Sequence, residues 1–283
     1  MIKILIDSAS DIDELEAKEK GIYMLPMEVN FGEDIYYDGV NLSHSEFFNK
    51  LIESDDLPKT SQINPFRFKE KFEELTKDGS SLICITISSK LSNTYQNAVV
   101  AAKEFPNQVF VIDSLNACIG ERILCDYALR LIQEDTPIKE IVARLEEQKH
   151  KIELLAVVGT LKYLKKGGRI SSVVAFTGEM LSIKPVISIV HGQVKMVGKA
   201  RGSKKGNNLL AEKIMNCGGI DFSFPYATAY SGLSSDLLKK YLSDSSYLWQ
   251  ESTSEVPIYQ IGSTIGTHIG PGGIAVAFFS KGK

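Results

Sequence analysis

Three short apolar segments constrain the fold of this chain more than any other feature of its sequence. They are rich in β-branched residues, and a polar turn and then a helical pattern follow each of them; they span Ile2–Ile6, Leu82–Ile87 and Val109–Ile112. Such segments are typical of buried strands, and their alternation with helices indicates a parallel, doubly wound α/β sheet. Because crossover connections are right-handed, the carboxyl ends of these strands should meet at one edge of that sheet.

The turn that follows Ile87 is rich in hydroxyl groups. Ser92 and Thr94 are favourable N-cap residues, so a helix should begin near them and run through Lys103. Ligands of open α/β sheets bind beyond the carboxyl ends of the strands, and helix N-termini attract anions. The hydroxyl cluster is therefore a candidate cradle for a carboxylate or a phosphate. Alternatively, Ser92 and Thr94 only cap their own helix.

The second half of the chain predicts a different sheet. A hairpin with the turn His191-Gly192 spans residues 183–199, and further strands are expected at 154–158, 227–230, 256–261 and 274–279. A length of 283 residues is sufficient for two domains, and a charged helix end near Lys149 precedes a new strand. We therefore expect an N-terminal α/β domain over residues 1–150 and a C-terminal, mixed-sheet α/β domain over residues 151–283.

The composition argues against several classes of protein. Lys and Arg number 32 against 35 for Asp and Glu, a net charge of -3, which does not favour a nucleic-acid binder. Asp7 follows the start too closely for a signal peptide, and no apolar run is long enough to span a bilayer. The cysteines lack Cys-x-x-Cys spacing, so we expect reduced core thiols in a cytoplasmic protein, without a metal site.

Two further stretches are candidates for chemistry. Residues 262–273 form a glycine-rich stretch that contains His268, which we interpret either as a ligand-binding loop or as a tight connection between strands. Basic residues gather at 162–169 and 199–205, which suggests an anionic ligand or an acidic partner. Alternatively, they form a solvated face with cations at a helix C-terminus, an interpretation that fits the first group well and Arg201 less well. No P-loop and no Gly-x-Gly-x-x-Gly fingerprint is present, so we expect no nucleotide cofactor.

Taken together, six segments of this sequence resemble the DegV family of bacterial fatty-acid-binding proteins. The resemblance covers nearly the whole chain, and its most specific parts are Thr-Ser-Gln, Lys-Gly-Gly-Arg and His-x-Gly-Pro-Gly. At Asn93 the chain departs from the family, which usually has glycine there. The six segments are Asp7-Ser8, Lys59–Gln62, Ser88–Tyr95, Leu161–Ile170, Lys199–Gly202 and Thr267–Gly272.

The resemblance implies a two-domain protein that encloses one long-chain fatty acid, with its carboxylate at the seam between the domains. Thr60, Ser92 and His268 match the family's carboxylate-binding residues, and Ser61 is a weaker candidate beside the first of them. Next to a carboxylate, a protonated His268 should titrate above the usual pKa of roughly 6.5, although a neutral donor is also possible.

The resemblance also implies a carrier rather than an enzyme. Such a carrier presents the carboxylate to a separate ATP-dependent fatty acid kinase, which forms an acyl phosphate for phospholipid synthesis. Arg201 matches an arginine of the rim that faces the kinase. The alternative is an enzyme that uses the same hydroxyl, His and Arg groups, such as a small-molecule phosphotransferase or a hydrolase. The absence of a nucleotide loop and of a recognised nucleophile motif favours the carrier.

Overall fold

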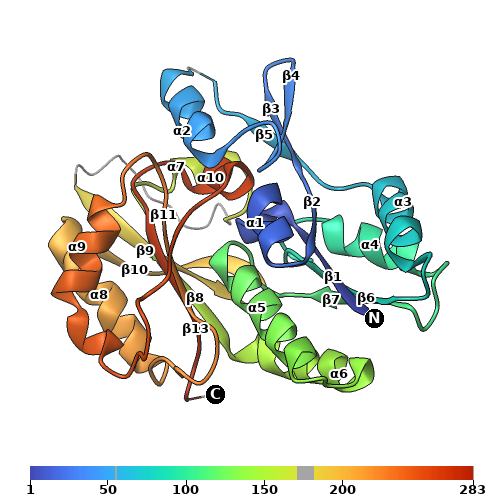
Figure 1. The fold of residues 1–283 in the computed structure, drawn as a ribbon. Helices are drawn as coiled ribbons and strands as arrows, with labels where there is room; N and C mark the ends of the chain where they lie inside the picture. Colours follow the sequence, from blue (N-terminus) through green and yellow to red (C-terminus); the bar gives the residue numbers. More distant parts are fainter. Residues whose placement is uncertain (55, 171–181, 283) are drawn as a thin grey trace.

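The computed structural model describes residues 1–54, 56–170 and 182–282 (Figure 1). Its first sheet, sheet A, is entirely parallel, which confirms the predicted doubly wound arrangement. The predicted strands at Ile2, Leu82 and Val109 lie side by side in it, because each is an apolar segment that becomes almost fully buried. In spatial order its strands are β2 (Tyr23–Leu25), β1 (Ile2–Asp7), β6 (Ser81–Thr86) and β7 (Val109–Asp113).

Among the helices around sheet A, one begins after Asn64, a residue whose type suits a helix N-terminus. Asn64 accepts a hydrogen bond from the Arg67 N–H at 3.0 Å and caps α3 (Pro65–Thr76), whose first residue is proline. Helix α3 packs against α4 (Thr94–Ala102), and both contact β6. Helix α5 (Ile119–Gln133) packs against β1 and β6, and it is followed by α6 (Ile138–Gln148) and by η2 (Lys149–Lys151).

The second half of the chain forms a six-stranded mixed sheet, sheet D, in which only β11 and β12 pair in parallel. Helices α8 (Ser203–Asn216) and α9 (Asp236–Asp244) pack against it, and the short turn η3 (Ser246–Trp249) follows α9. In spatial order the strands are β10 (Gln193–Arg201), β9 (Ile183–Val190), β8 (Ile152–Val157), β13 (Ile274–Phe279), β11 (Ala227–Tyr230) and β12 (Ile258–Gln260).

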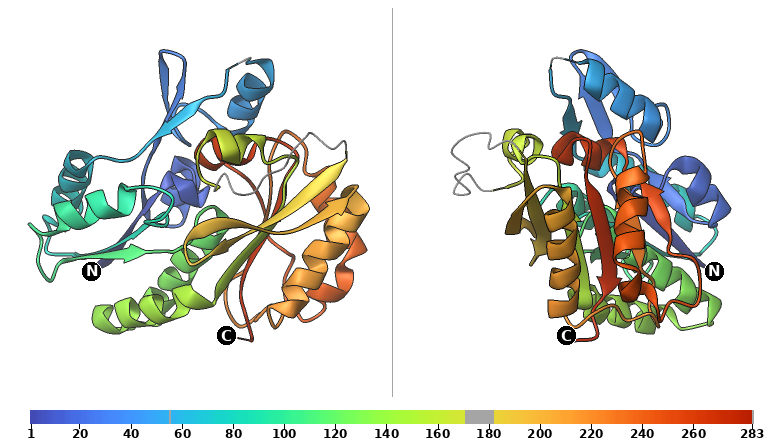
Figure 2. Two further views of the ribbon diagram at one scale, coloured as in Figure 1. Left: turned by 180° about the vertical axis from the view of Figure 1, so that it is seen from behind. Right: turned by 90° about the vertical axis from the view of Figure 1, so that its left-hand side faces the viewer.

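A small third sheet, sheet B, stands above the other two with α2 (His44–Glu53) beside it (Figures 1 and 2). Its antiparallel strands are β4 (Asp34–Tyr37), β3 (Glu28–Phe31) and β5 (Lys59–Ser61). Helix α2 begins with a capping box, in which Ser43 and Glu46 each bond the other's backbone N–H. Sheet B and α2 lie directly over α10 (Ser263–Ile269) and α7 (Lys162–Lys166).

The prediction of a loop over residues 262–273 is wrong in its first half, which forms helix α10. Gly262, Gly266 and Gly270 recur every four residues, so they share one face of that helix. A Cβ at Gly266 would lie 2.4 Å from a ring carbon of Phe47 in α2. Close packing of this glycine face, which no larger residue could achieve, outweighs the low helix propensity of glycine.

The chain changes sheets near residue 150, where we placed the domain boundary. The strands of sheets A and B precede that point and those of sheet D follow it. Nevertheless α5 contacts β1 and β6 on one side and β8, β11 and β13 on the other, and the main hydrophobic cluster includes residues from both halves. Two domains over residues 1–150 and 151–283 therefore remain a proposal. No helix in the described ranges is long and apolar enough to cross a bilayer.

Candidate functional site

A cavity of about 330 Å³ lies between the carboxyl edge of sheet A and one face of sheet D, under α7 and α10. This is the position where open α/β sheets hold ligands. Most of its wall is apolar, which suits a hydrocarbon more than a sugar or a nucleotide. The apolar lining residues are Met27, Ile87, Leu91, Ala117, Leu154, Ala156, Leu164, Ile187, Ile189, Val194, Ile261, Ile265, Ile269 and Ala275.

Three polar side chains predicted from the sequence line this one cavity, and we call Thr60, Ser92 and His268 the rim. The hydroxyl oxygen of Thr60 in β5 lies 3.0 Å from Nε2 of His268 in α10. Ser92 lies just before α4, and its Oγ is 2.9 Å from the hydroxyl of Thr94. The fold thus brings together residues that are far apart in the sequence, and their hydrogen-bonding groups can face a single polar head group.

The surroundings of His268 favour its neutral form. Burial and the positive charge of Arg169 lower its pKa from 6.5 to about 4, opposite to the direction expected for a protonated ring beside a carboxylate. Its Nδ1 is buried and has no hydrogen-bond partner in the described part of the chain. A neutral imidazole can donate one N–H, so the ring can bind an anion without forming an ion pair.

Glycine at position 167 allows the close approach of α7 to His268. A Cβ at Gly167 would lie 2.2 Å from the unpartnered Nδ1 of the ring. Any larger residue there would displace either the helix end or the imidazole. The first glycine of the Lys-Gly-Gly-Arg segment therefore has a steric reason that the sequence alone did not supply.

Arg169 is a lining residue that the sequence analysis did not select. Its Nη1 donates to the carbonyl oxygen of Gly167 at 2.6 Å, and its Nε donates to that of Leu91 at 3.3 Å. The basic residues at 162–169 also suit a helix C-terminus, so charge alone does not distinguish Arg169. The position of Arg169 directly after Gly167-Gly168, in a segment already noted for its specificity, was the signal that could have identified it.

Ser61 and Arg201 do not line the cavity. Side chains alternate across a strand, so the neighbour of Thr60 points away from it, and Gln62 lines the cavity in place of Ser61. Arg201 is the exposed last residue of β10 and pairs with Ile183. Its position is compatible with contact to another molecule but not with direct contact to the cavity lining.

Asn93, where the family usually has glycine, is accommodated without strain. Its φ is -76°, so no left-handed backbone is needed there. It precedes α4 and lines the cavity. The departure from glycine thus adds an amide side chain beside the rim and leaves the backbone in an ordinary conformation.

Asp7 acts inside the fold rather than in the cavity. Its two carboxylate oxygens accept hydrogen bonds from the Ala9 N–H at 2.9 Å and the Ile87 N–H at 2.8 Å. These contacts join the end of β1 to the end of β6 and cap η1 (Ser8–Ser10). Complete burial raises the pKa of Asp7 to about 7, so the loss of hydration outweighs its two hydrogen bonds.

Two buried aspartates hold the N-terminus of α10, and we call Asp11 and Asp38, with the backbone they bind, the anchor. Asp11 accepts from the Gly262 N–H at 2.8 Å. Asp38 accepts from the Ser263 N–H at 2.9 Å, the Ser263 hydroxyl at 2.5 Å and the Thr264 N–H at 3.1 Å. The sequence analysis missed the anchor, because more than two hundred residues separate its partners and no local pattern links them.

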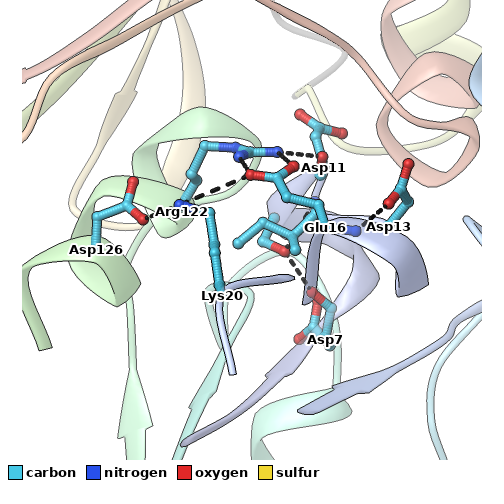
Figure 3. Close-up of polar contacts among 9 residues, drawn as sticks. Asp7, Asp11, Asp13, Glu16, Lys20, Arg122 and Asp126 are labelled. Carbon is cyan, nitrogen blue, oxygen red and sulfur yellow. Dashed lines mark hydrogen bonds and ion pairs between the residues drawn. The ribbon is translucent and has the colours of Figure 1, made fainter. Parts of the chain in front are cut away.

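The segment that carries Asp11 is itself held by α5 (Figure 3). The fully buried guanidinium of Arg122 bonds both carboxylate oxygens of Glu16 in α1 (Glu14–Glu19) and donates to the Asp11 carbonyl at 2.5 Å. Its centre also lies 3.8 Å from the ring centroid of Tyr259 in β12. Burial raises the pKa of the Asp11 carboxyl to about 6. One arginine thus connects the turn after β1 to sheet D.

The described residues do not include a group of three or more His, Cys, Asp or Glu side chains that could hold a metal ion. The polar groups that line the cavity include the hydroxyls and the imidazole of the rim and the guanidinium of Arg169. Such groups recognise an oxyanion through hydrogen bonds.

Comparison with known proteins identifies relatives over the full length of the chain. The sequence profile described as "Uncharacterised protein, DegV family" matches residues 1–281. The DegV domain-containing protein TTE1491 from Caldanaerobacter subterraneus is 35% identical over 286 residues, and the alignment covers 99% of both chains.

Solved structures agree with this result. A DegV family protein from Thermus thermophilus, described with fatty acid binding, superposes with a TM-score of 0.87 at 29% identity over 99% of each chain. The fatty acid binding DegV family protein SAG1342 from Streptococcus agalactiae gives a TM-score of 0.84 at 26% identity, again over 99% of each chain.

Proposed function

The chain belongs to the DegV family, and from that premise we propose that it binds one long-chain fatty acid in the cavity. The acyl chain lies along the apolar lining, and the carboxylate is held by Thr60, Ser92 and His268. The observation that carries this proposal is that one cavity combines a mostly apolar wall with these hydrogen-bonding side chains. The fatty acid binding ascribed to the relatives from Thermus thermophilus and Streptococcus agalactiae supports it.

The energetics of binding explain why both parts of the cavity are needed. Burial of an acyl chain of roughly 16 carbons at about 0.8 kcal/mol per methylene gives on the order of 10 kcal/mol before costs. A carboxylate that leaves water without partners would cancel much of this gain. Hydroxyls of Thr60 and Ser92 and a neutral His268 can supply partners while leaving the carboxylate its negative charge.

We further propose that the protein is a cytoplasmic carrier that works with a separate fatty acid kinase. The kinase binds ATP, and a carboxylate oxygen attacks the γ-phosphorus as the bond to the departing ADP oxygen breaks. The acyl phosphate formed in this way then enters phospholipid synthesis. The exposed position of Arg201 supports a role in contact with the kinase, and the chain itself needs no nucleotide site.

The Thr60–His268 pair could also be interpreted as a nucleophile with its base, as in a hydrolase. Such a base is normally oriented by an acceptor on its other ring nitrogen. The Nδ1 of His268 has no such acceptor in the described ranges. The geometry therefore favours binding over nucleophilic catalysis.

The first test is to identify and titrate the ligand. Mass spectrometry of an organic extract of purified protein should reveal a long-chain fatty acid in about a one-to-one ratio, and delipidated protein should bind added palmitate or oleate. Calorimetric titration with Mg-ATP should show no binding. An extract without fatty acid, together with no binding of either added acid, would refute the proposal, whereas saturable ATP binding would favour a phosphotransferase.

The second test separates the carboxylate site from the kinase-facing residue. Ser92→Ala should lower fatty-acid occupancy, whereas Arg201→Ala should keep full occupancy and lose acyl-phosphate formation with the cognate kinase. Occupancy and turnover are measured on the same preparations. If both variants keep full occupancy and full turnover, these residue assignments are wrong even though the family is correct.

A further inference from the structure

Asp38 is a buried carboxylate whose hydrogen bonds with the described residues all go to the first turn of the helix that carries His268. Its side chain is 1% exposed. One oxygen accepts from the N–H and the hydroxyl of Ser263, and the other accepts from the Thr264 N–H. A carboxylate bonded in this way fixes both the position of the helix end and its rotation, because the donors point in different directions.

The second fixed point of α10 comes from the same small sheet. Asp38 directly follows β4, and its N–H donates to the carbonyl oxygen of Met27 just before β3. Thr60 lies in β5, where it pairs with Val29 of β3. Sheet B therefore presents a carboxylate to the first turn of α10 through Asp38 and a hydroxyl to its last turn through Thr60.

The two contacts lie near opposite ends of the helix. Ser263 and His268 are five residues apart, about 7.5 Å along the helix axis. Asp38 and Thr60 flank β3 on opposite sides, beside Met27 and Val29 respectively. Between the two contacts, Gly266 lies against Phe47 so closely that even a methyl group would collide with the ring. A shift of the first turn would therefore move the His268 ring relative to Thr60.

We infer that Asp38 is a positioning residue for carboxylate recognition: through the first turn of α10 it sets the place of His268 beside Thr60. This inference rests on the proposed function, since it assigns the residue to the carboxylate end of a fatty-acid site. Asp38 does not line the cavity, so it acts through the helix and not by touching the ligand.

The test compares two ligands that share a chain and differ in the head group. Delipidated wild type and Asp38→Asn are titrated with lauric acid and with dodecanol, and the His268 ring signals are followed by NMR, assigned with His268→Gln. The asparagine keeps one acceptor oxygen but turns an NH2 group toward the donors of α10. We expect acid affinity to fall about tenfold and alcohol affinity to change less than about twofold, with shifted ring signals.

Asp221→Asn is the matched control. Asp221 also accepts from a serine N–H and hydroxyl, those of Ser223 at 3.0 and 2.6 Å, but it does not line the cavity. This variant should keep the acid-to-alcohol preference and the ring signals. If Asp38→Asn does not fold, Ser263→Ala removes one of the three bonds to Asp38, and we expect it to lower the acid preference about threefold.

The outcomes separate this inference from the proposed function. If wild type binds neither ligand, the fatty-acid proposal itself has failed. If wild type binds both, and the variants at 38 and 263 keep the wild-type acid preference and ring signals, Asp38 is only structural and the inference is overturned. An equal loss of affinity for acid and alcohol would also overturn it, because a general loosening of the cavity does not distinguish the head groups.

Discussion

The anchor and the rim lie at opposite ends of the same short helix, and they use their polar groups differently. In the anchor, Asp38 accepts three hydrogen bonds from α10. In the rim, the Thr60 hydroxyl meets one nitrogen of His268 while the other nitrogen is buried and has no partner in the described part of the chain. A buried polar group normally has a partner, so this nitrogen, which packs against Gly167, is a cost to the fold.

This difference explains how the fold can hold a site that is incompletely satisfied. An unpartnered polar atom destabilises a fold by about 1–3 kcal/mol, and this loss must be offset elsewhere. The saturated carboxylate at the start of α10 supplies such an offset near the site. Four changes test this difference between the anchor and the rim, and the largest effect is expected in the anchor.

Asp38→Ala should destabilise the lipid-free protein by about 4 kcal/mol. The change leaves three donors of α10 buried without an acceptor, and each such loss is worth about 1–3 kcal/mol without being fully additive. Urea unfolding followed by circular dichroism measures the effect. A loss below about 1 kcal/mol would show that water replaces the carboxylate and that the anchor contributes little.

Protonation of His268 should lower the free energy of unfolding by about 3 kcal/mol. Burial and Arg169 lower its folded pKa to about 4 from 6.5. Between those pH values the unfolded chain binds a proton that the folded chain does not, so this contribution is complete above about pH 6.5 and is lost as the pH falls toward 4.

The measurement is the difference in unfolding free energy between wild type and His268→Gln from pH 7.5 to 4.5. The stability contributions of Asp7 and Asp11 have the opposite pH dependence, because their pKa values are raised to about 7 and about 6. Both proteins contain these residues, so subtracting the two unfolding free energies removes their contribution. A difference that stays constant with pH would contradict a buried, neutral imidazole.

Gly266 lies between the anchor and the rim. Gly266→Ala should lower the free energy of unfolding by about 2 kcal/mol. The new methyl group would collide with the Phe47 ring, and overpacking of this kind usually costs 1–3 kcal/mol. The control is Gly206→Ala in α8, where the closest atom would lie 3.3 Å away, so that only a small displacement is needed and the loss of stability should be clearly smaller. Equal effects of both substitutions would mean that α10 is not tightly seated.

Ser92→Ala should have the smallest effect on the lipid-free fold, about 1 kcal/mol or less, but should weaken palmitate binding about tenfold. Its hydroxyl accepts one N–H, that of Thr94, at 3.2 Å, whereas a bound carboxylate would lose a donor worth about 1–3 kcal/mol. Thermal unfolding and a binding titration on the same protein test both halves. The opposite result, a large loss of stability with unchanged affinity, would mean that Ser92 stabilises the fold, as the anchor does, and does not bind the carboxylate.

The local elements were predictable where sequence and packing favour the same structure. Apolar segments such as Leu82–Ile87 become strands in any context that can bury them, and the capping box of Ser43 and Glu46 requires only residues three apart. Thr60, Ser92 and His268 were selected through the family resemblance, and the structure places all three on one cavity. Their role as carboxylate ligands is still a prediction.

Sequence patterns alone predicted most of the strands and helices in their order, because hydrophobic periodicity and caps act over a few residues. The tertiary structure was needed to show that residues 263–269 are helical and that Asp38 bonds Ser263. It was also needed to show that Arg169 and Gln62 line the cavity while Ser61 does not. Contacts of this kind join residues more than two hundred positions apart. Their energies depend on which surfaces the folded chain brings together, and a short sequence window contains no record of them.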